Sequence, residues 1–242
     1  MKRFLMLILI LGVTSLSAQE NPLIKHFEAY YTQMKAQGDI QGIINAMTHL
    51  NVIAPSQARK DTLAYIYMSE GQHVQALNTI GYDKVATDSD IAVEVKAIAL
   101  KAVKQPQLAV GHFEELFKRD PNTLVAYELA ELNLQLKNLS DAEKHINYGL
   151  NNAKPEENKA FYETQNPYQV PLKSAFMYLN ALLTYNKDPK ANIDAAVDIL
   201  DATLKTAPNF NLVNISKNEL LRQKQVLQAQ AAQQQQQQEP KN

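Results

Sequence analysis

Small and large apolar residues recur along this chain with a period of 33. One column of alanines consists of Ala64, Ala97 and Ala130, and a second consists of Ala76, Ala109 and Ala142. A third column places a large apolar residue one helical turn after the second alanine, at Ile80, Phe113 and Ile146. A fixed period of about 20–50 residues is typical of arrays in which each period forms one structural unit. The chain is therefore predicted to be a repeat protein.

Each period reads as two helices. In the first clear copy, Leu63, Ala64 and Tyr67 fall on one face of a helix, and Gly71 interrupts the run before a second helix. Two closely packed antiparallel helices need a small residue where they cross, and a large residue one turn away fills the neighbouring hole. A proline such as Pro121 ends the second helix, because its ring keeps the preceding residue from helical geometry. Long alternating β-branched runs are missing, so we expect an all-α fold.

The array is predicted to cover residues 19–208 as about five helical pairs. The last pair is stretched, and its apolar positions are Phe176, Leu179, Leu183, Ala196 and Leu200. A weaker copy opens the array with Phe27, Tyr30 and Met34. Residues 154–171 interrupt the period with three prolines and three aromatic residues. We interpret this insert as a helix extension and a loop; the alternative is a binding segment, since inserts in repeat arrays often lie on a binding face.

The C-terminal residues are predicted to form a capping helix and a tail. Ser216 and Glu219 have the spacing of a capping box that opens a helix. Val213, Leu220 and Leu227 form a single apolar stripe within residues 209–227, which suits a terminal helix that covers the last repeat. Residues 228–242 are rich in glutamine, and we expect a frayed helix or a disordered tail there.

Residues 1–18 have the layout of a secretory signal peptide. Lys2 and Arg3 precede a short apolar run, and small and polar residues follow up to Ala18. The run is too short to cross a hydrocarbon layer of about 30 Å, so cleavage near Gln19 is expected. The mature chain is predicted to be exported, periplasmic or secreted, with no stable insertion in the membrane.

Composition narrows the possible functions. The chain has no cysteine, which excludes disulfides and a lipid on an N-terminal cysteine. Removing Lys2 and Arg3 from the 24 basic residues leaves 22 against 25 acidic ones, a near-balance that argues against nucleic acid and anionic membranes as partners.

No residue pattern indicates catalysis, a metal or a cofactor. A phosphate loop and a nucleophile elbow are both missing, so we expect no enzymatic activity. His112 and His145 share a repeat position, but no third ligand follows at a coordinating offset, and a repeated surface histidine is the favoured interpretation. The adjacent pairs Glu114-Glu115 and Glu156-Glu157 point about 100° apart on a helix, so we interpret them as solvated faces.

The repeat pattern resembles that of the tetratricopeptide repeat (TPR) family. Leu63-Ala64, Tyr67, Gly71, Ala76 and Ile80 match one copy of the family pattern. The next two copies match at Val93, Ala97, Leu100, Ala109, Phe113 and Pro121, and at Leu129-Ala130, Ala142, Ile146 and Gly149. The period is one residue shorter than usual and the family's tryptophan is missing. The resemblance implies an α-solenoid of about five TPR-like helix-turn-helix repeats with a C-terminal capping helix.

In the family, certain positions of each first helix line a concave groove that binds peptides. Carried over to this sequence, those positions are Asp61, Tyr65, Met68, Glu94, Ile98, Lys101, Tyr127, Glu131 and Leu134. The resulting hypothesis is a non-catalytic scaffold or adaptor of a bacterial cell envelope that binds a protein or peptide partner in this groove. The alternative is a structural envelope protein whose repeats self-associate. The sequence names neither the partner nor the pathway.

Overall fold

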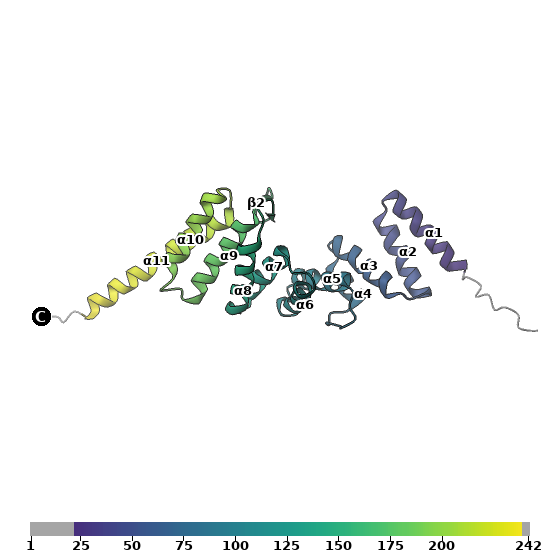
Figure 1. Cartoon of the computed structure of the whole chain (residues 1–242), viewed down its shortest axis with the longest axis horizontal. Coiled ribbons are helices and arrows are strands. Elements are labelled where there is room, and N and C mark those ends of the chain that lie inside the picture. Colours follow the sequence, from purple (N-terminus) through teal and green to yellow (C-terminus); the bar gives the residue numbers. More distant parts are fainter. Residues whose placement is uncertain (1–21, 239–242) are drawn as a thin grey trace, which may run out of the picture. The chain divides into compact units, whose positions relative to one another are not determined.

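The computed structural model describes residues 22–238, which form two compact units, one ending at Ile80 and the other beginning at Gly81 (Figure 1). The predicted signal segment lies outside the described residues. The first unit contains α1 (Pro22–Gln37), α2 (Ile40–Ile53), α3 (Gln57–Ser69) and α4 (His73–Ile80). The helices of the second unit are α5 (Asp90–Ala102), α6 (Pro106–Arg119), α7 (Thr123–Gln135), α8 (Leu139–Asn152), α9 (Leu172–Lys187), α10 (Ile193–Thr206) and α11 (Asn211–Gln238). Its strands are β1 (Asn158–Phe161) and β2 (Tyr168–Pro171).

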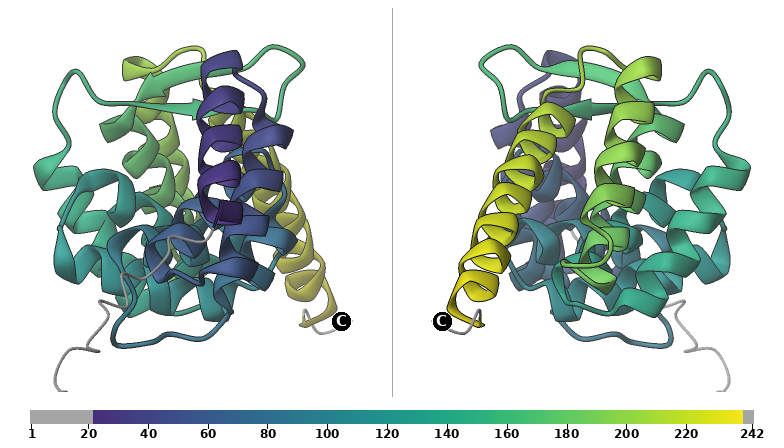
Figure 2. Two further views of the ribbon diagram at one scale, coloured as in Figure 1. Left: turned by 90° about the vertical axis from the view of Figure 1, so that its right-hand side faces the viewer. Right: turned by 90° about the vertical axis from the view of Figure 1, so that its left-hand side faces the viewer.

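Successive helices pair as hairpins: α1 with α2, α3 with α4, α5 with α6, α7 with α8, and α9 with α10. Within the second unit, α6 packs against α7, α8 against α9, and α10 against α11 (Figures 1 and 2). The prediction of an all-α solenoid of about five TPR-like hairpins with a final helix is confirmed. Among residues 22–238, no helix is long and apolar enough to cross a membrane.

The turn inside each of the first four hairpins contains one residue with left-handed backbone geometry. These residues are Gly38, Gly71, Lys104 and Lys137, with φ angles of 70°, 72°, 60° and 63°. In every turn the N–H of this residue donates to the carbonyl three residues earlier, and the next N–H donates to the carbonyl five residues earlier. This hydrogen-bond pattern closes the end of a helix with a left-handed residue. The period of 33 in the sequence is therefore also a period in the backbone.

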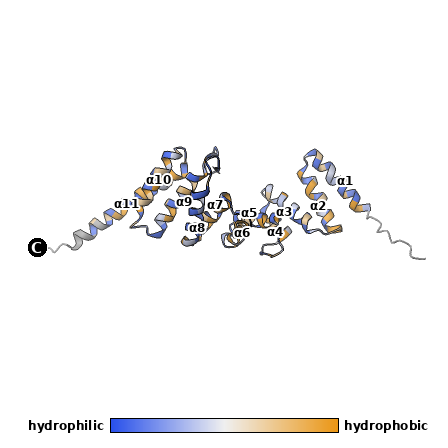
Figure 3. Cartoon of the chain, viewed as in Figure 1, coloured by the Kyte–Doolittle hydropathy of each residue, from blue (hydrophilic) through white to orange (hydrophobic). Residues whose placement is uncertain are grey.

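The two alanine columns are buried where the helices of a hairpin come together. Each of these six alanines is 0% exposed. Hydrophobic and hydrophilic positions are interspersed along the helices (Figure 3). Between hairpins, α8 also approaches α9 closely, because a Cβ atom built on Gly149 would lie 2.1 Å from Cζ of Phe176. Small residues thus set the spacing of the helices.

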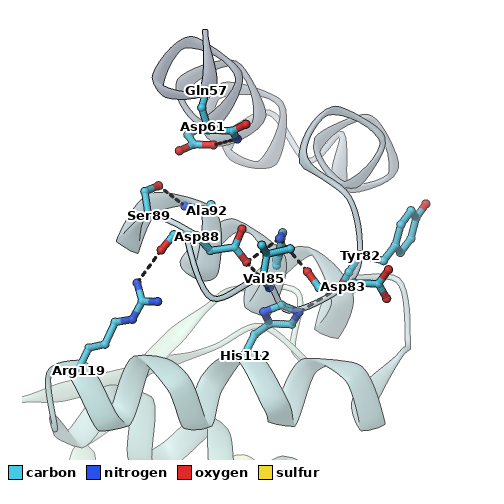
Figure 4. A network of polar contacts seen from close by, with 11 residues as sticks. Gln57, Asp61, Tyr82, Asp83, Val85, Asp88, Ser89, Ala92, His112 and Arg119 are labelled. Atoms are coloured by element: carbon cyan, nitrogen blue, oxygen red, sulfur yellow. Dashed lines mark hydrogen bonds and ion pairs between the residues drawn. The ribbon is translucent and has the colours of Figure 1, made fainter.

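A buried lysine fixes the loop that precedes α5. Lys96 is 0% exposed, and its Nζ donates to the Asp83 carbonyl at 2.8 Å and to Oδ2 of Asp88 at 2.7 Å. The same carboxylate accepts the backbone N–H of Val85 at 3.0 Å (Figure 4). Arg119 of α6 also holds this loop, through the Asp88 carbonyl at 3.1 Å. The repeat pattern does not predict that Lys96 is buried, because a lysine in a helix normally faces water.

His112 and His145 are buried, so the interpretation as surface histidines is wrong. They are 2% and 0% exposed. Nε2 of His112 lies 3.0 Å from the Tyr82 carbonyl (Figure 4), and Nε2 of His145 lies 2.9 Å from Oε1 of Glu114. Burial lowers the pKa of His112 despite its bond to Tyr82. Both residues pack in the core of the second unit and are not displayed for a ligand.

Glu115 and Glu157 are more engaged than solvated faces would be, and Glu156 and Glu157 lie in the turn before β1, not on a helix as expected. Glu115 bonds Lys84 at 2.9 Å and Arg119 at 3.0 Å, and these hydrogen bonds lower its pKa to about 2. Glu157 accepts from the hydroxyl of Thr123 at 2.9 Å and from the N–H of Lys154 at 2.8 Å. The Glu157 carboxylate therefore connects the start of α7 to the start of the insert.

The insert at residues 154–171 is a β-hairpin, which corrects the expectation of a helix extension and a loop. Its strands pair antiparallel, with Asn158 opposite Pro171 and Phe161 opposite Tyr168. In Figure 2 the strands run crosswise to the neighbouring helices. Both strands contact α9, and Val170 and Phe161 are 1% and 8% exposed. The hairpin is part of the core of the second unit.

The last helix begins before the predicted capping box at Ser216 and continues past residue 227. It starts at Asn211, so Ser216 and Glu219 lie inside it and form no capping box: Ser216 bonds the Tyr178 hydroxyl at 3.2 Å, and Glu219 bonds Arg222. The stripe of Val213, Leu220 and Leu227 packs into the core as predicted. The helix continues to Gln238, through much of the stretch where we expected a frayed helix or a disordered tail.

Replacing a crossing alanine by a larger residue tests this packing. We expect Ala142→Leu to lower the free energy of unfolding by about 1–3 kcal/mol, because the added atoms must displace buried neighbours. Ala229→Leu, on the exposed side of α11, is the matched control and should change little. Urea unfolding measures both. Equal, negligible changes would show that the repeat register is wrong.

The left-handed turn residues offer a stabilising substitution. Lys104 has a φ of 60°, where a side chain is strained and glycine is not. We expect Lys104→Gly to raise the free energy of unfolding by about 0.5–1 kcal/mol, the relieved strain exceeding the entropy lost by glycine. Lys144→Gly, in the interior of α8, should lower it by about the same amount. A loss of stability in Lys104→Gly would contradict the assigned turn geometry.

Candidate functional site

Three of the predicted groove residues form a stripe along one face of α7. Tyr127, Glu131 and Leu134 are spaced by four and three positions, which places them on the same side of a helix. Tyr127 and Leu134 are 1% and 7% exposed, whereas the side chain of Glu131 is 42% exposed. The stripe therefore combines a buried aromatic ring, a buried aliphatic group and a carboxylate at the edge.

A second stripe, on α9, meets the first at a cavity. Tyr178, Leu182 and Asn186 are each four positions apart, and with the α7 stripe they line a space of about 310 Å³. The other lining residues are Gln135, Phe161, Leu179 and Leu212. We call this space the α7–α9 cavity. Because Phe161 belongs to the β-hairpin and Leu212 to α11, four elements of the second unit contribute to it.

The β-hairpin holds Phe161 at the cavity through aromatic contacts. The Phe161 ring stacks on Tyr168, its cross-strand neighbour, with centroids 5.8 Å apart, and lies 4.7 Å from Phe210. The Tyr178 ring lies 5.3 Å from Phe210 on the same side. Aromatic pairs at such distances contribute beyond the area they bury. The insert thereby supplies one wall of the cavity.

Glu131, which lines the cavity, belongs to a cluster of four charged residues that are paired with one another. Lys101 of α5 bonds both Glu128 and Glu131 of α7, and Lys159 of β1 bonds Glu128 at 2.7 Å. Burial alone would raise the pKa of Glu128, but the charges and hydrogen bonds of the two lysines outweigh it and lower the pKa. Likewise, burial would lower the pKa of Lys101, and the two glutamates instead raise it. Glu128 and Lys101 therefore hold their charges near neutral pH, and the cluster pairs two lysines with two glutamates.

Among the side chains that line the cavity, Tyr127 has the one buried polar atom without a hydrogen-bond partner. Its hydroxyl is buried and has no hydrogen-bond partner, while Nζ of Lys159 lies 4.7 Å from the centre of its ring. Burial, reinforced by the charges of Glu131 and Glu128, raises its pKa well above the ordinary value. Tyr127 is thus a neutral phenol that can donate. A buried polar group without a partner costs about 1–3 kcal/mol.

The remaining predicted groove residues lie elsewhere. Asp61, Tyr65 and Met68 are on α3 in the first unit; Asp61 is 3% exposed and accepts from Nε2 of Gln57 at 2.7 Å, whereas Tyr65 is 44% exposed. On α5, Glu94 is exposed and Ile98 is half-buried. Only Lys101 of that helix is tied to the α7 stripe. A binding role for these residues stays a prediction.

A second recess lies on the outer helices α6 and α8. It measures about 500 Å³, and its lining residues are Lys84, Glu114, Glu115, Phe117, Lys118, Pro121 and Lys144. Although larger, it has one aromatic residue, and its glutamates are already bonded to Lys84, Arg119 and His145. The α7–α9 cavity is the better candidate because three aromatic residues, Tyr127, Phe161 and Tyr178, line it. In the described part of the chain, no three acidic or histidine side chains gather closely enough to hold a metal ion.

The cavity residues of α9 were not predicted from the sequence, although helical spacing could have identified them. Tyr178, Leu182 and Asn186 follow one another at intervals of four on a helix that the repeat predicted. Phe161 and Leu212 left no such signal, because the first lies in the insert and the second precedes the apolar stripe of the last helix.

Two solved structures have a similar fold. A tetratricopeptide repeat protein from Parabacteroides merdae ATCC 43184 aligns with a TM-score of 0.59 and 16% identity, covering 83% of this chain and 73% of its own. The MamA protein aligns with a TM-score of 0.54 and 14% identity, covering 76% of this chain and 91% of its own. No protein-family model matches the sequence, and no curated protein matches it significantly. The resemblance found in the sequence is confirmed as the fold of tetratricopeptide repeat proteins.

The environment of the Tyr127 hydroxyl can be tested without a ligand, by measuring the stability of variants. We expect Tyr127→Phe to leave the free energy of unfolding unchanged or to raise it by up to about 1 kcal/mol, because no hydrogen bond is lost. Tyr178→Phe removes a hydroxyl that bonds Ser216, and should cost about 0.5–1.5 kcal/mol. Urea unfolding of both variants measures the difference. A loss above 1 kcal/mol in Tyr127→Phe would show that its hydroxyl has a partner.

Proposed function

We propose that this protein is a non-catalytic scaffold or adaptor of the bacterial cell envelope, and that it binds a peptide or partner protein at the first-helix face of its second unit. The α7–α9 cavity carries this proposal. Buried aromatic rings beside a charged edge are the composition of the centres of protein interfaces, where a few residues supply most of the affinity. The fold supports the same class of function, since TPR-like arrays display the faces of their first helices to partners.

Placement in the envelope is part of the proposal and rests on residues 1–18. Their charged start, short apolar run and small residues favour export and cleavage near Gln19. Intact mass of the protein recovered from a host with a secretory pathway would support export if the chain began near Gln19. Recovery of the chain from Met1 in the membrane fraction would contradict it.

Self-association is the second candidate function, and the last helix favours it. Ile215, Leu221 and Val226 of α11 are 54%, 37% and 45% exposed. Exposed apolar residues on a helix can pack against another copy. Sedimentation at several concentrations would separate the two candidates, because a scaffold for other proteins would remain a monomer.

A cavity-filling substitution tests where a partner binds. Leu182→Phe adds volume at a half-buried wall of the cavity, so it should reduce capture at least about tenfold while leaving the fold intact, as expected when an interface centre is blocked. Leu124→Phe is the matched control, because Leu124 is 54% exposed on α7 and does not line the cavity. Quantitative mass spectrometry of proteins captured from envelope extract measures the effect. Equal capture by all three proteins would exclude the cavity as the binding site.

A further inference from the structure

We propose that residues 81–89, the 81–89 loop, form an acid-sensitive clasp on the second unit: a proton taken up by His112 of α6 loosens this loop from α5 and α6. The inference is independent of the proposed function. Three observations carry it: the neutral ring of His112 bonds the loop, its second nitrogen has no acceptor, and the charges that face it do not compensate for a cation.

His112 holds the 81–89 loop as a neutral ring (Figure 4). Its Nε2 lies 3.0 Å from the Tyr82 carbonyl oxygen, which can only accept, so Nε2 carries the proton of the neutral ring. The residue is 2% exposed. The loop is also held on α5, where Nζ of Lys96 bonds the Asp83 carbonyl and the Asp88 carboxylate. One donor of this buried network is therefore a histidine, whose charge ordinarily changes between about pH 5 and 8.

A second proton on His112 has no acceptor while the loop is closed. It would bind Nδ1, which is buried and has no hydrogen-bond partner among the described residues. A buried donor without an acceptor is costly, and a buried cation is more so. Once the loop opens, water can solvate both N–H groups of the ring. Protonation therefore favours the open loop.

The charges that face His112 do not compensate for a cation. Lys96 of α5 and Lys84 of the loop both disfavour it, whereas the Asp88 carboxylate favours it. Oδ2 of Asp88 is already bonded to Nζ of Lys96 at 2.7 Å and to the N–H of Val85 at 3.0 Å. A protonated His112 would thus lie near two lysines and beside a carboxylate whose bonds are already made.

The pKa of His112 has the direction that this mechanism requires. Burial is the main cause that lowers it, and the charges of Lys96 and Lys84 lower it further. The bond to Tyr82 and the charge of Asp88 oppose them only in part. The closed loop therefore binds the second proton less readily than the open loop, in which a histidine has its ordinary pKa of about 6.5. Closure is most stable above that pH and weakens as the pH falls below it.

Two amides of the loop report whether it is closed. The N–H of Val85 donates to the Asp88 carboxylate, and the N–H of Asp88 donates to the Val85 carbonyl, both at 3.0 Å. Their hydrogen exchange, read by NMR in the full chain and divided by the intrinsic rate at each pH, gives the fraction of open loop. Between about pH 7.5 and 5.5 we expect this fraction to rise about three- to tenfold, tenfold being the limit for one histidine over this range. Carboxylates with ordinary pKa values titrate below this range.

Two variants assign the response to His112. His112→Gln keeps an N–H donor near the position of Nε2 and cannot titrate, so its open fraction should stay constant over the same pH range. His145→Gln is the matched control. His145 has the same repeat position and is 0% exposed, but its Nε2 faces Glu114, so this variant should respond to pH as the unaltered protein does. Circular dichroism and the unfolding midpoint establish that both variants are folded.

Several outcomes would overturn the inference. An open fraction that does not change with pH would do so, as would an equal rise in His112→Gln. Loss of the response in His145→Gln would refute the assignment to His112. An equal rise for amides inside α7 would show that the whole unit unfolds and that no clasp opens. If His112→Gln does not fold, the His112 ring is titrated by NMR in the unaltered protein: a pKa at or above about 6.5 contradicts the inference, and a lower pKa together with the rise in open fraction supports it.

Discussion

The close approach of paired helices is the constraint on which the rest of this structure depends. The alanines of the two columns are fully buried, and Gly149 leaves room for the Phe176 ring where α8 meets α9. Helices that meet through small residues bring their backbones close, and the larger residues one turn away then interlock. The side chains of α7 and α9 that face the α7–α9 cavity are positioned by this spacing, since both helices pack on α8.

The β-hairpin closes one side of the space between α7 and α9. Without it, the first helices of two successive repeats would present an open face. With it, Phe161 closes one side, and Lys159 sits above the Tyr127 ring while it bonds Glu128. The groove and the insert, which were alternatives from the sequence, therefore meet at one cavity. The Tyr127 hydroxyl itself is buried and has no hydrogen-bond partner.

The sequence predicted the features that repeat and missed those that occur once. The period of 33 located the helices and their crossings, and Gly38 and Gly71 located two of the turns. Lys104 and Lys137 occupy the equivalent positions of the next two turns, although lysine does not favour left-handed backbone geometry. Lys96 could not be predicted as buried, because its partners lie in an irregular loop. The prediction of a capping box at Ser216 was wrong because the last helix already starts at Asn211. The residue before it, Phe210, is 0% exposed, so burial of this ring sets the start of the helix. Phe161 was missed because the insert has no counterpart in the other repeats.

Hydrogen exchange measured along the chain tests most directly whether the α7–α9 cavity is where a peptide binds. Exchange is recorded with and without an excess of the proteins that the chain captures from envelope extract. Binding in the cavity predicts slower exchange in the hairpin at residues 158–171 and in the adjoining ends of α7 and α9, with α5 and α6 unchanged. Slower exchange confined to α6 and the outer recess, or to α11, would contradict this account.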